Sequence, residues 1–353
     1  MFFDSCQRGW ICASSVQGSV NRLEREHTII IGAGPCGLSA AIEMQKYGVN
    51  PLVIEKGNVV NAIYHYPTHQ TFFSSSDRLE SGDVPFITEK KKPVRNQALA
   101  YYRTVAERKD LRINAFEKVI AVEKTGAGFR LQTETAAGKQ NSYEAKYVVA
   151  ATGYYDQPRK MGVKGEELPK VHHYFKEAHP YFGKDVVIVG GKNSAVDAAL
   201  ELHKAGARIT VLYRGSDYSS SIKPWILPEF ESLVRNGKIN MVFQAHVAEI
   251  TEDMVYYQVN GKTEAVQNDF VFAMTGYQPD NAFLQDMGIE ITEATGTPVF
   301  DEATMETNVK GIYIAGVIAA GFNNNKIFIE NGRFHGGIIA KSIFAQETKA
   351  SSR

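Results

Sequence analysis

The hydrophobic pattern of the chain is dominated by two copies of a strand–helix–strand unit. In the first copy, residues 28–31 and 52–54 are short apolar runs rich in β-branched residues, the composition of strands that are buried on both faces. Between these runs, apolar side chains recur at helical spacing over residues 38–47. The second copy has its apolar runs at 186–189 and 209–213. Two such units predict an α/β protein with two parallel-sheet domains.

Shorter apolar stretches after each unit predict two small β meanders. Each meander ends in a Thr-Gly pair, Thr152-Gly153 in the first and Thr275-Gly276 in the second. We expect the chain to leave the first domain at the first pair and to return to it at the second. Helical spacing also predicts helices over 96–109 and 331–344. The strands expected in the meanders cover residues 119–122, 129–133, 143–147, 241–244, 255–259 and 270–272.

The first apolar run leads into a glycine-rich turn with the spacing G-x-G-x-x-G. The first glycine of this spacing permits a tight turn, the second lets the backbone approach a pyrophosphate, and the third lets the helix pack on the strand. Glu55 ends the next strand about twenty residues later, where an acid accepts the hydroxyls of an adenosine ribose, with Lys56 beside it. The sequence therefore predicts a dinucleotide site at Gly32, Gly34, Pro35, Cys36, Gly37, Glu55 and Lys56.

The second unit carries a modified form of the same motif. Its turn reads Gly190-Gly191-Lys192-Asn193-Ser194-Ala195, so that a lysine replaces the second glycine and an alanine the third. The following strand ends on Arg214 instead of an acid. A guanidinium at this place suits a ribose 2′-phosphate, which favours NADPH over NADH. Two nucleotide folds in one chain have a direct chemical use, because electrons can pass from one bound cofactor to the other.

Composition and charge exclude several classes of protein. The chain has 353 residues, too many for a single usual core, and 39 basic residues balance 39 acidic ones. We therefore expect no nucleic acid as a main partner, because no net field concentrates polyanions. No apolar run approaches the ~20 residues needed to span a bilayer, and the first 26 residues do not have the pattern of a signal peptide. We expect no membrane partner and no metal site.

Cys36 has two interpretations, and its position leaves both open. It lies in the phosphate-binding turn at a predicted helix N-terminus, where the helix dipole lowers the pKa of a thiol. It can equally be a small residue that fills a tight turn. Three cysteines in a chain of this length argue against a disulfide framework and for a reducing compartment, so we expect the cytoplasm. Cys6 and Cys12 are interpreted as incidental thiols, with a flexible redox pair as the alternative.

Further candidate residues lie in three loops. Residues 64–76 are dense in aromatic and hydroxyl side chains and could cover a flavin ring, with His69 among the groups that bind it. Thr152 and Gly153 follow the last strand of the first meander. Residues 311–316 predict a strand and a tight turn that ends at Gly316, ahead of a helix whose dipole could stabilise negative charge on a reduced ring.

Taken together, these motifs resemble the flavoprotein disulfide reductases with two dinucleotide-binding domains. Within that group the chain is most similar to the YpdA-type bacillithiol disulfide reductases. The resemblance runs through residues 27–345. The stretches that carry it are GAGPCGLSAAIE, YPTHQTFFSSSD, HYFKEAHPYFGKDVVIVGGKNSAVDAALEL, YRGSDYSSSIKPWILP, IYIAGVIAAG and IFIENGRFHGGIIA.

The resemblance implies FAD on the first motif and NADPH on the second. We accordingly expect two Rossmann-like domains, an FAD-binding domain of residues 27–157 and 275–353 and an NADPH-binding domain of residues 158–274 inserted in it. Residues 1–26 are expected to be a poorly ordered extension. The implied substrate is the disulfide of a low-molecular-weight thiol, with bacillithiol disulfide as the first candidate, and we expect a homo-oligomer.

The resemblance also makes Cys36 the candidate redox cysteine. No C-x-x-C or C-x4-C pair lies beside either motif, which excludes a dithiol relay of the thioredoxin-reductase or glutathione-reductase type. Cys36 would then form a mixed disulfide with half of the substrate, or electrons would pass directly from flavin to substrate. Three other functions remain open: a flavin monooxygenase, an electron donor similar to ferredoxin–NADP reductase, and a non-enzymatic redox sensor that binds flavin.

Overall fold

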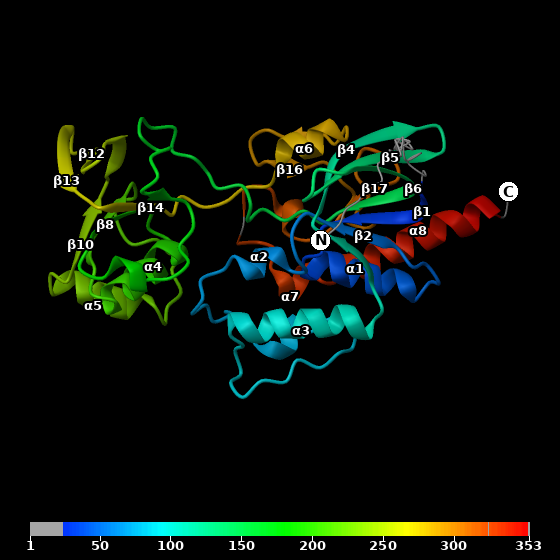
Figure 1. The fold of residues 1–353 in the computed structure, drawn as a ribbon, viewed down its shortest axis with the longest axis horizontal. Helices are drawn as coiled ribbons and strands as arrows, with labels where there is room; N and C mark the ends of the chain where they lie inside the picture. Colours follow the sequence, from blue (N-terminus) through cyan, green and yellow to red (C-terminus); the bar gives the residue numbers. More distant parts are fainter. Residues whose placement is uncertain (1–23, 324, 352–353) are drawn as a thin grey trace, which may run out of the picture.

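The computed structural model describes residues 24–323 and 325–351, which form two lobes joined by two crossings of the chain (Figure 1). The lobe with the first glycine motif is built on a sheet of strand order β3-β2-β1-β6-β5-β4, with β17 paired to part of β6. The ladder from β3 to β6 is parallel, whereas β5 and β4 run antiparallel to their neighbours. The strands are β1 (Glu24–Ile31), β2 (Leu52–Glu55), β3 (Arg112–Ala115), β4 (Glu117–Thr125), β5 (Gly128–Thr135), β6 (Gln140–Ala150) and β17 (Ile312–Ile314).

Helix α1 (Pro35–Gln45) begins directly after the first glycine motif, with Pro35 in its first turn, where a missing N–H costs nothing. It packs against α8 (His335–Ser351), and a Cβ built on Gly336 would lie 2.5 Å from the Cα of Ala40. The two helix backbones therefore approach so closely that only glycine fits. The other helices of this lobe are α2 (Asn61–Tyr64), η1 (Ser76–Leu79), α3 (Arg95–Arg108), α6 (Asn281–Asp286), η3 (Val317–Ala320) and α7 (Ile329–Gly332), and β15 (Ile291–Thr292) pairs with β16 (Thr297–Pro298).

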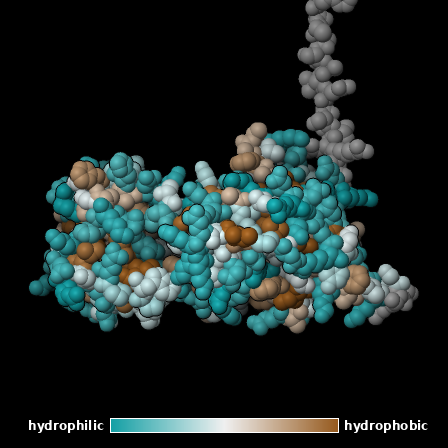
Figure 2. Space-filling model, turned by 90° about the horizontal axis from the view of Figure 1, so that it is seen from below, coloured by the Kyte–Doolittle hydropathy of each residue, from teal (hydrophilic) through white to brown (hydrophobic). Residues whose placement is uncertain are grey.

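The second lobe contains a parallel sheet of order β10-β9-β8-β14-β7 and a small antiparallel sheet β11-β12-β13. Seen from below in Figure 2, the two lobes lie side by side, and apolar side chains are scattered over a mainly hydrophilic surface. The elements of this lobe are β7 (Val171–His172), η2 (His179–Tyr181), β8 (Asp185–Val189), α4 (Asn193–Lys204), β9 (Arg208–Tyr213), α5 (Leu227–Arg235), β10 (Ile239–Phe243), β11 (His246–Ile250), β12 (Met254–Val259), β13 (Lys262–Gln267) and β14 (Phe270–Ala273).

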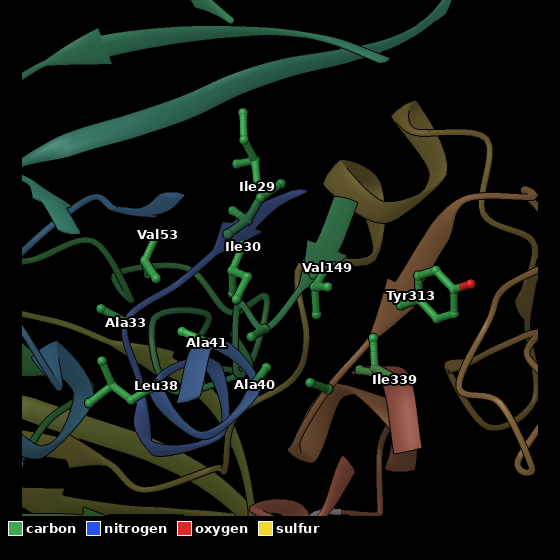
Figure 3. Packing of buried hydrophobic residues seen from close by; sticks show 14 of the residues in the cluster. Ile29, Ile30, Ala33, Leu38, Ala40, Ala41, Val53, Val149, Tyr313 and Ile339 are labelled. Atoms are coloured by element: carbon green, nitrogen blue, oxygen red, sulfur yellow. The ribbon is translucent and has the colours of Figure 1, made fainter. Parts of the chain in front are cut away.

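Each lobe has its own hydrophobic core. Buried apolar residues of 29–151 and 284–343 form one cluster, and those of 171–274 form two others. The first cluster joins segments from both ends of the chain: in Figure 3, β1 and α1 lie near β6, β17 and α8. The residues labelled there are Ile29, Ile30, Ala33, Leu38, Ala40, Ala41, Val53, Val149, Tyr313 and Ile339. The domain boundaries given above remain predictions.

Four details of the sequence interpretation are wrong. Residues 241–244 and 270–272 were expected in the second meander, but they overlap β10 and β14 of the parallel sheet. Residues 24–26 belong to β1 and not to an extension, because they extend its ladder with β6 from Glu24 opposite Tyr143 to Glu26 opposite Ala145. The helix expected over 331–344 is interrupted between α7 and α8 at Arg333, whose guanidinium donates a hydrogen bond to the carbonyl of Glu80. Helix α5 was not expected. Cys6 and Cys12 lie outside the described residues.

Within the described ranges, no helix is long and apolar enough to cross a membrane.

Candidate active site

Both glycine motifs line one cleft with a volume of about 1130 Å³. The cleft brings together residues from both lobes, although the motifs lie far apart in the sequence. Of the candidate residues, only Gly37 and His69 do not line it. Those that do are Gly32, Gly34, Pro35, Cys36, Glu55, Lys56, Thr152, Gly153, Gly190, Gly191, Lys192, Asn193, Ser194, Arg214 and Gly316.

The three glycines of the first motif have different surroundings. Gly32 has a φ of +109°, and a Cβ there would lie 2.5 Å from the carbonyl oxygen of Ala151. Gly34 has no atom within 4 Å of a Cβ position, so its backbone faces the open cleft. Gly37 would place a Cβ 1.9 Å from the Gly32 carbonyl oxygen, which assigns it to helix–strand packing. This arrangement has the form of a phosphate cradle at a helix N-terminus.

Glu55 is buried at the end of β2 and accepts two backbone hydrogen bonds. Its Oε2 accepts the N–H of Ala33 and its Oε1 the N–H of Gly57, each at 2.8 Å. Burial raises the pKa of Glu55, and the two N–H groups oppose part of that rise. A carboxylate offers about four acceptor sites, so two ribose hydroxyls can still bind. Beside it, Lys56 forms an ion pair with Asp156 at 2.9 Å.

Thr152 supplies a further polar group that points to a ligand. Its Oγ1 is buried beside the cleft and has no hydrogen-bond partner among the described residues. Buried polar groups are nearly always hydrogen-bonded in folded proteins, so a bound molecule is the natural partner. The open backbone at Gly34, the ribose-type acid Glu55 and the unpaired Thr152 hydroxyl therefore fit a dinucleotide.

The thiol of Cys36 packs against two glycines at the edge of the cleft, and the residue as a whole is half-buried. A Cβ built on either Gly316 or Gly332 would lie 2.9 Å from its Sγ, so these glycines make room for the sulfur. Burial raises the pKa of Cys36 to about 12. Burial of the thiol therefore opposes the lowering of this pKa that the dipole of α1 would produce.

The second motif is tied to the loop that follows β9. Gly190 has a φ of +143°, and a Cβ there would lie 2.4 Å from the Met274 carbonyl oxygen. The Asn193 side chain donates to the carbonyl of Ser221 at 2.8 Å and accepts the N–H of Lys223 at 2.9 Å. This residue thus holds the loop against the start of α4.

Lys192 and Arg214 give the second motif its positive charge. Both side chains are exposed and both residues line the cleft. Within the described ranges, neither residue forms a salt bridge with a carboxylate. Two unneutralised cations at the end of a nucleotide motif fit an additional phosphate group.

The loop of residues 64–76 reaches the cleft through other side chains than the one expected. Tyr66, Gln70, Phe72 and Phe73 line it, whereas the His69 ring packs on Phe175 at a centroid distance of 5.9 Å. Burial lowers the pKa of His69. The expectation that His69 binds a cofactor is therefore not supported by its position. The high density of aromatic residues in this loop was the signal that could have pointed to Tyr66, Phe72 and Phe73 instead of His69.

Sequence reasoning also missed a group of tyrosines where the chain crosses between the lobes. The rings of Tyr174 and Tyr277 stack at 5.5 Å, and those of Tyr155 and Tyr277 lie 4.6 Å apart. Tyr66, Tyr154, Tyr155 and Tyr277 all line the cleft. The Tyr154-Tyr155 pair was visible in the sequence, but only the fold brings the others to it.

The chain is similar to known proteins over most of its length. Residues 29–316 match the family described as pyridine nucleotide-disulphide oxidoreductase. The chain belongs to this family. It is 63% identical over 325 residues to the bacilliredoxin reductase Bdr of Bacillus subtilis, covering 92% of this chain and 99% of the relative.

Two solved structures are also similar over most of their length. The bacillithiol disulfide reductase Bdr (YpdA) from Bacillus cereus is 65% identical with a TM-score of 0.91, and the one from Staphylococcus aureus is 58% identical with a TM-score of 0.88. In each case 92% of this chain and 100% of the other are covered.

Membership of the family confirms several sequence predictions. The protein is a flavoprotein disulfide oxidoreductase that uses FAD and a nicotinamide dinucleotide, and its fold is α/β with two Rossmann-like units. The predicted resemblance to the YpdA-type reductases is confirmed as well. The roles of the individual site residues and the domain boundaries remain predictions.

Proposed function

We propose that the protein reduces the disulfide of a low-molecular-weight thiol with electrons from NADPH. The observation that carries this proposal is the cleft lined by both nucleotide motifs and by Cys36. Bound NADPH and FAD would together supply hydride and electron transfer. In the overall reaction NADPH and a proton are consumed, and the S–S bond is broken to give two thiols.

The residues of the first motif would hold FAD and those of the second NADPH. Gly34 and the start of α1 would face the pyrophosphate of FAD, and Glu55 would accept the ribose hydroxyls. Thr152 would gain a partner for its buried hydroxyl. The cations of Lys192 and Arg214 support NADPH over NADH, because a 2′-phosphate is present only in NADPH.

Bacillithiol disulfide is the first candidate substrate. The structures from B. cereus and S. aureus are named for the reduction of this disulfide, at 65% and 58% identity. The B. subtilis relative is named as a reductase of bacilliredoxin instead. These names support a disulfide derived from bacillithiol, either free or carried by a protein.

Two routes for reduction of the substrate differ in the role of Cys36. A mixed disulfide on Cys36 needs its thiolate and needs space around the sulfur. The raised pKa of Cys36 and the contact of its sulfur with the backbones at Gly316 and Gly332 oppose both requirements. They support direct reduction of the substrate in the cleft. Cys36→Ala distinguishes the routes: direct reduction retains disulfide-dependent NADPH oxidation, and a mixed disulfide on Cys36 loses it.

The function is tested with the purified holoenzyme. NADPH oxidation is measured with bacillithiol disulfide, glutathione disulfide and coenzyme A disulfide as alternative acceptors. We expect turnover with at least one of them, fastest with bacillithiol disulfide. Reduction of an iron–sulfur protein with no disulfide turnover would favour the electron-donor alternative, and a long-lived flavin hydroperoxide would favour the monooxygenase.

A further inference from the structure

Three aromatic side chains from separate parts of the sequence meet at the rim of the cleft. Phe73 and Phe328 come from the first lobe and line the cleft, whereas Trp225 comes from the second lobe and does not. The rings of Phe73 and Trp225 meet edge to face at a centroid distance of 6.2 Å. We call these three residues, with Lys92 and Lys223, the rim patch.

The two lysines place positive charge over these rings. The Nζ of Lys92 lies 4.0 Å from the centroid of the Trp225 ring. The Nζ of Lys223 lies 5.1 Å from the Phe73 ring and 6.0 Å from the Phe328 ring. Each ammonium group thus connects one lobe to the other across the rim.

Further cations surround the rim patch. Lys90, Lys91 and Lys326 are exposed next to it in the sequence, and the N–H of Ser76 donates to the carbonyl of Lys91 at 3.0 Å, which holds that segment beside Phe73. Of the nearby acids, Glu330 accepts a hydrogen bond from Ser74 at 2.7 Å, and Asp77 and Glu89 are exposed. These three acids are fewer than the five lysines at positions 90, 91, 92, 223 and 326. A chain with equal numbers of acidic and basic residues therefore has a local excess of positive charge at this rim.

Two of the three rings of the rim patch are exposed to water. The Trp225 residue is 56% exposed and Phe328 is 39% exposed. Large aromatic residues are enriched at the centres of protein interfaces, where they supply most of the binding energy. A ring that stays this exposed beside a redox cleft is typical of a surface that another molecule covers.

We propose that the rim patch docks a small redox protein whose acidic face surrounds a reducible disulfide. This inference rests on the proposed disulfide reduction. Trp225, Lys92 and Lys223 do not line the cleft, so a small disulfide inside it does not reach them, whereas a protein lying across its mouth does. The positive rim selects an acidic partner. The S–S bond of the partner is broken with two electrons from NADPH, and two thiols are formed.

The test uses two variants of the rim patch and two matched controls on the second lobe. Trp225→Ala removes the exposed ring, and the double variant Lys92→Glu with Lys223→Glu reverses the charge. The controls are Phe182→Ala, at a residue that is 76% exposed on the loop after η2, and Lys262→Glu on β13. The probes are the bacilliredoxin of B. subtilis, charged as a mixed disulfide with bacillithiol, and free bacillithiol disulfide.

We expect both rim variants to raise the KM for charged bacilliredoxin by about tenfold or more, with kcat within about twofold of wild type. The KM for free bacillithiol disulfide and the rate of flavin reduction by NADPH stay unchanged. Raising the salt concentration from about 50 to about 300 mM increases the KM of the wild type for charged bacilliredoxin. The same change has little effect on the KM of the charge-reversed variant.

Four results would overturn the proposal. An equal rise in the KM for free bacillithiol disulfide would assign the rim patch to the small molecule. Equal effects of the rim and control variants would assign it no docking role. Wild-type turnover of the free disulfide without turnover of charged bacilliredoxin would reject the protein partner and leave the proposed function intact, whereas absence of turnover with every disulfide would reject both.

Discussion

Cys36 in the native protein is expected to react much more slowly with an alkylating reagent than an ordinary thiol does. Only the thiolate attacks, and burial raises the pKa of Cys36 from 9.0 to about 12. A shift of this size lowers the thiolate fraction at neutral pH about a thousandfold relative to an unperturbed thiol. Limited access to the sulfur beside Gly316 and Gly332 acts in the same direction.

The assay compares native holoenzyme with the same protein unfolded in urea. Both are treated with iodoacetamide between about pH 6 and about pH 10, and the peptide that contains Cys36 is quantified by mass spectrometry. We expect a native rate that is about a thousandfold lower near neutral pH and that rises about tenfold per pH unit up to pH ~10, because the native thiolate fraction does not saturate in this range. The unfolded protein should level off near the ordinary thiol pKa.

A plateau of the native rate near neutral pH would refute this reasoning. It would mean that the N-terminus of α1 stabilises the thiolate more than burial destabilises it. In that case Cys36 would have the protonation state of a nucleophile, and the mixed-disulfide route would become the better explanation of disulfide reduction.

Three further predictions concern stability and cofactor choice. Gly336→Ala should lower the free energy of unfolding, measured in urea, by about 2 kcal/mol, because the new Cβ would lie 2.5 Å from the Ala40 Cα. Gly337→Ala is the control, since a Cβ there has no neighbour closer than 3.7 Å. Equal losses in the two variants would contradict the packing argument. Burial alone would raise the pKa of Glu117, but hydrogen bonds from Thr133, Asn141, Tyr143 and Asn114 lower it overall. The ionised form of Glu117 therefore contributes stability that is present above its ordinary pKa of 4.5 and is lost as the pH falls through the lower pKa of the folded state. Glu117→Gln should lower the free energy of unfolding by about 2 kcal/mol at neutral pH and by less in acid. A loss that does not depend on pH would show that the charge is not the cause. Arg214→Ala should raise the KM for NADPH about tenfold and leave that for NADH unchanged in steady-state kinetics, and a parallel rise for both would reject a 2′-phosphate contact.

Local pattern was sufficient for the two strand–helix–strand units and for most of the cleft. The glycines at 32, 34, 190 and 191 could be placed because the steric demands of a tight turn fix their spacing. Glu55 could be placed because it ends the strand that follows the first glycine motif. The protonation state of the Cys36 thiol could not be predicted. Its pKa depends on Gly316 and Gly332, which lie about 300 residues away along the chain and reach the sulfur only in the folded core.

The same limit applies to His69 and to the rim patch. The sequence of residues 64–76 shows aromatic density but not which rings turn inward, and His69 turns to Phe175 of the other lobe. Trp225 lies in a segment that lacked clear periodicity in the sequence, and its neighbours Phe73 and Lys92 come from far earlier positions. Contacts between lobes depend on topology, which no local pattern encodes.

The split core has a consequence for the order in which the chain can fold during synthesis. Strand β6 pairs with β17 at residues 148–150, and α1 packs on α8, so the first lobe needs segments that leave the ribosome last. The second lobe is continuous over its sheet from β7 to β14 and can close as soon as it emerges. A nascent chain that stalls before β17 would thus carry a folded second lobe beside an unpaired edge at residues 148–150 of β6. Chaperones or proteases would bind at that edge.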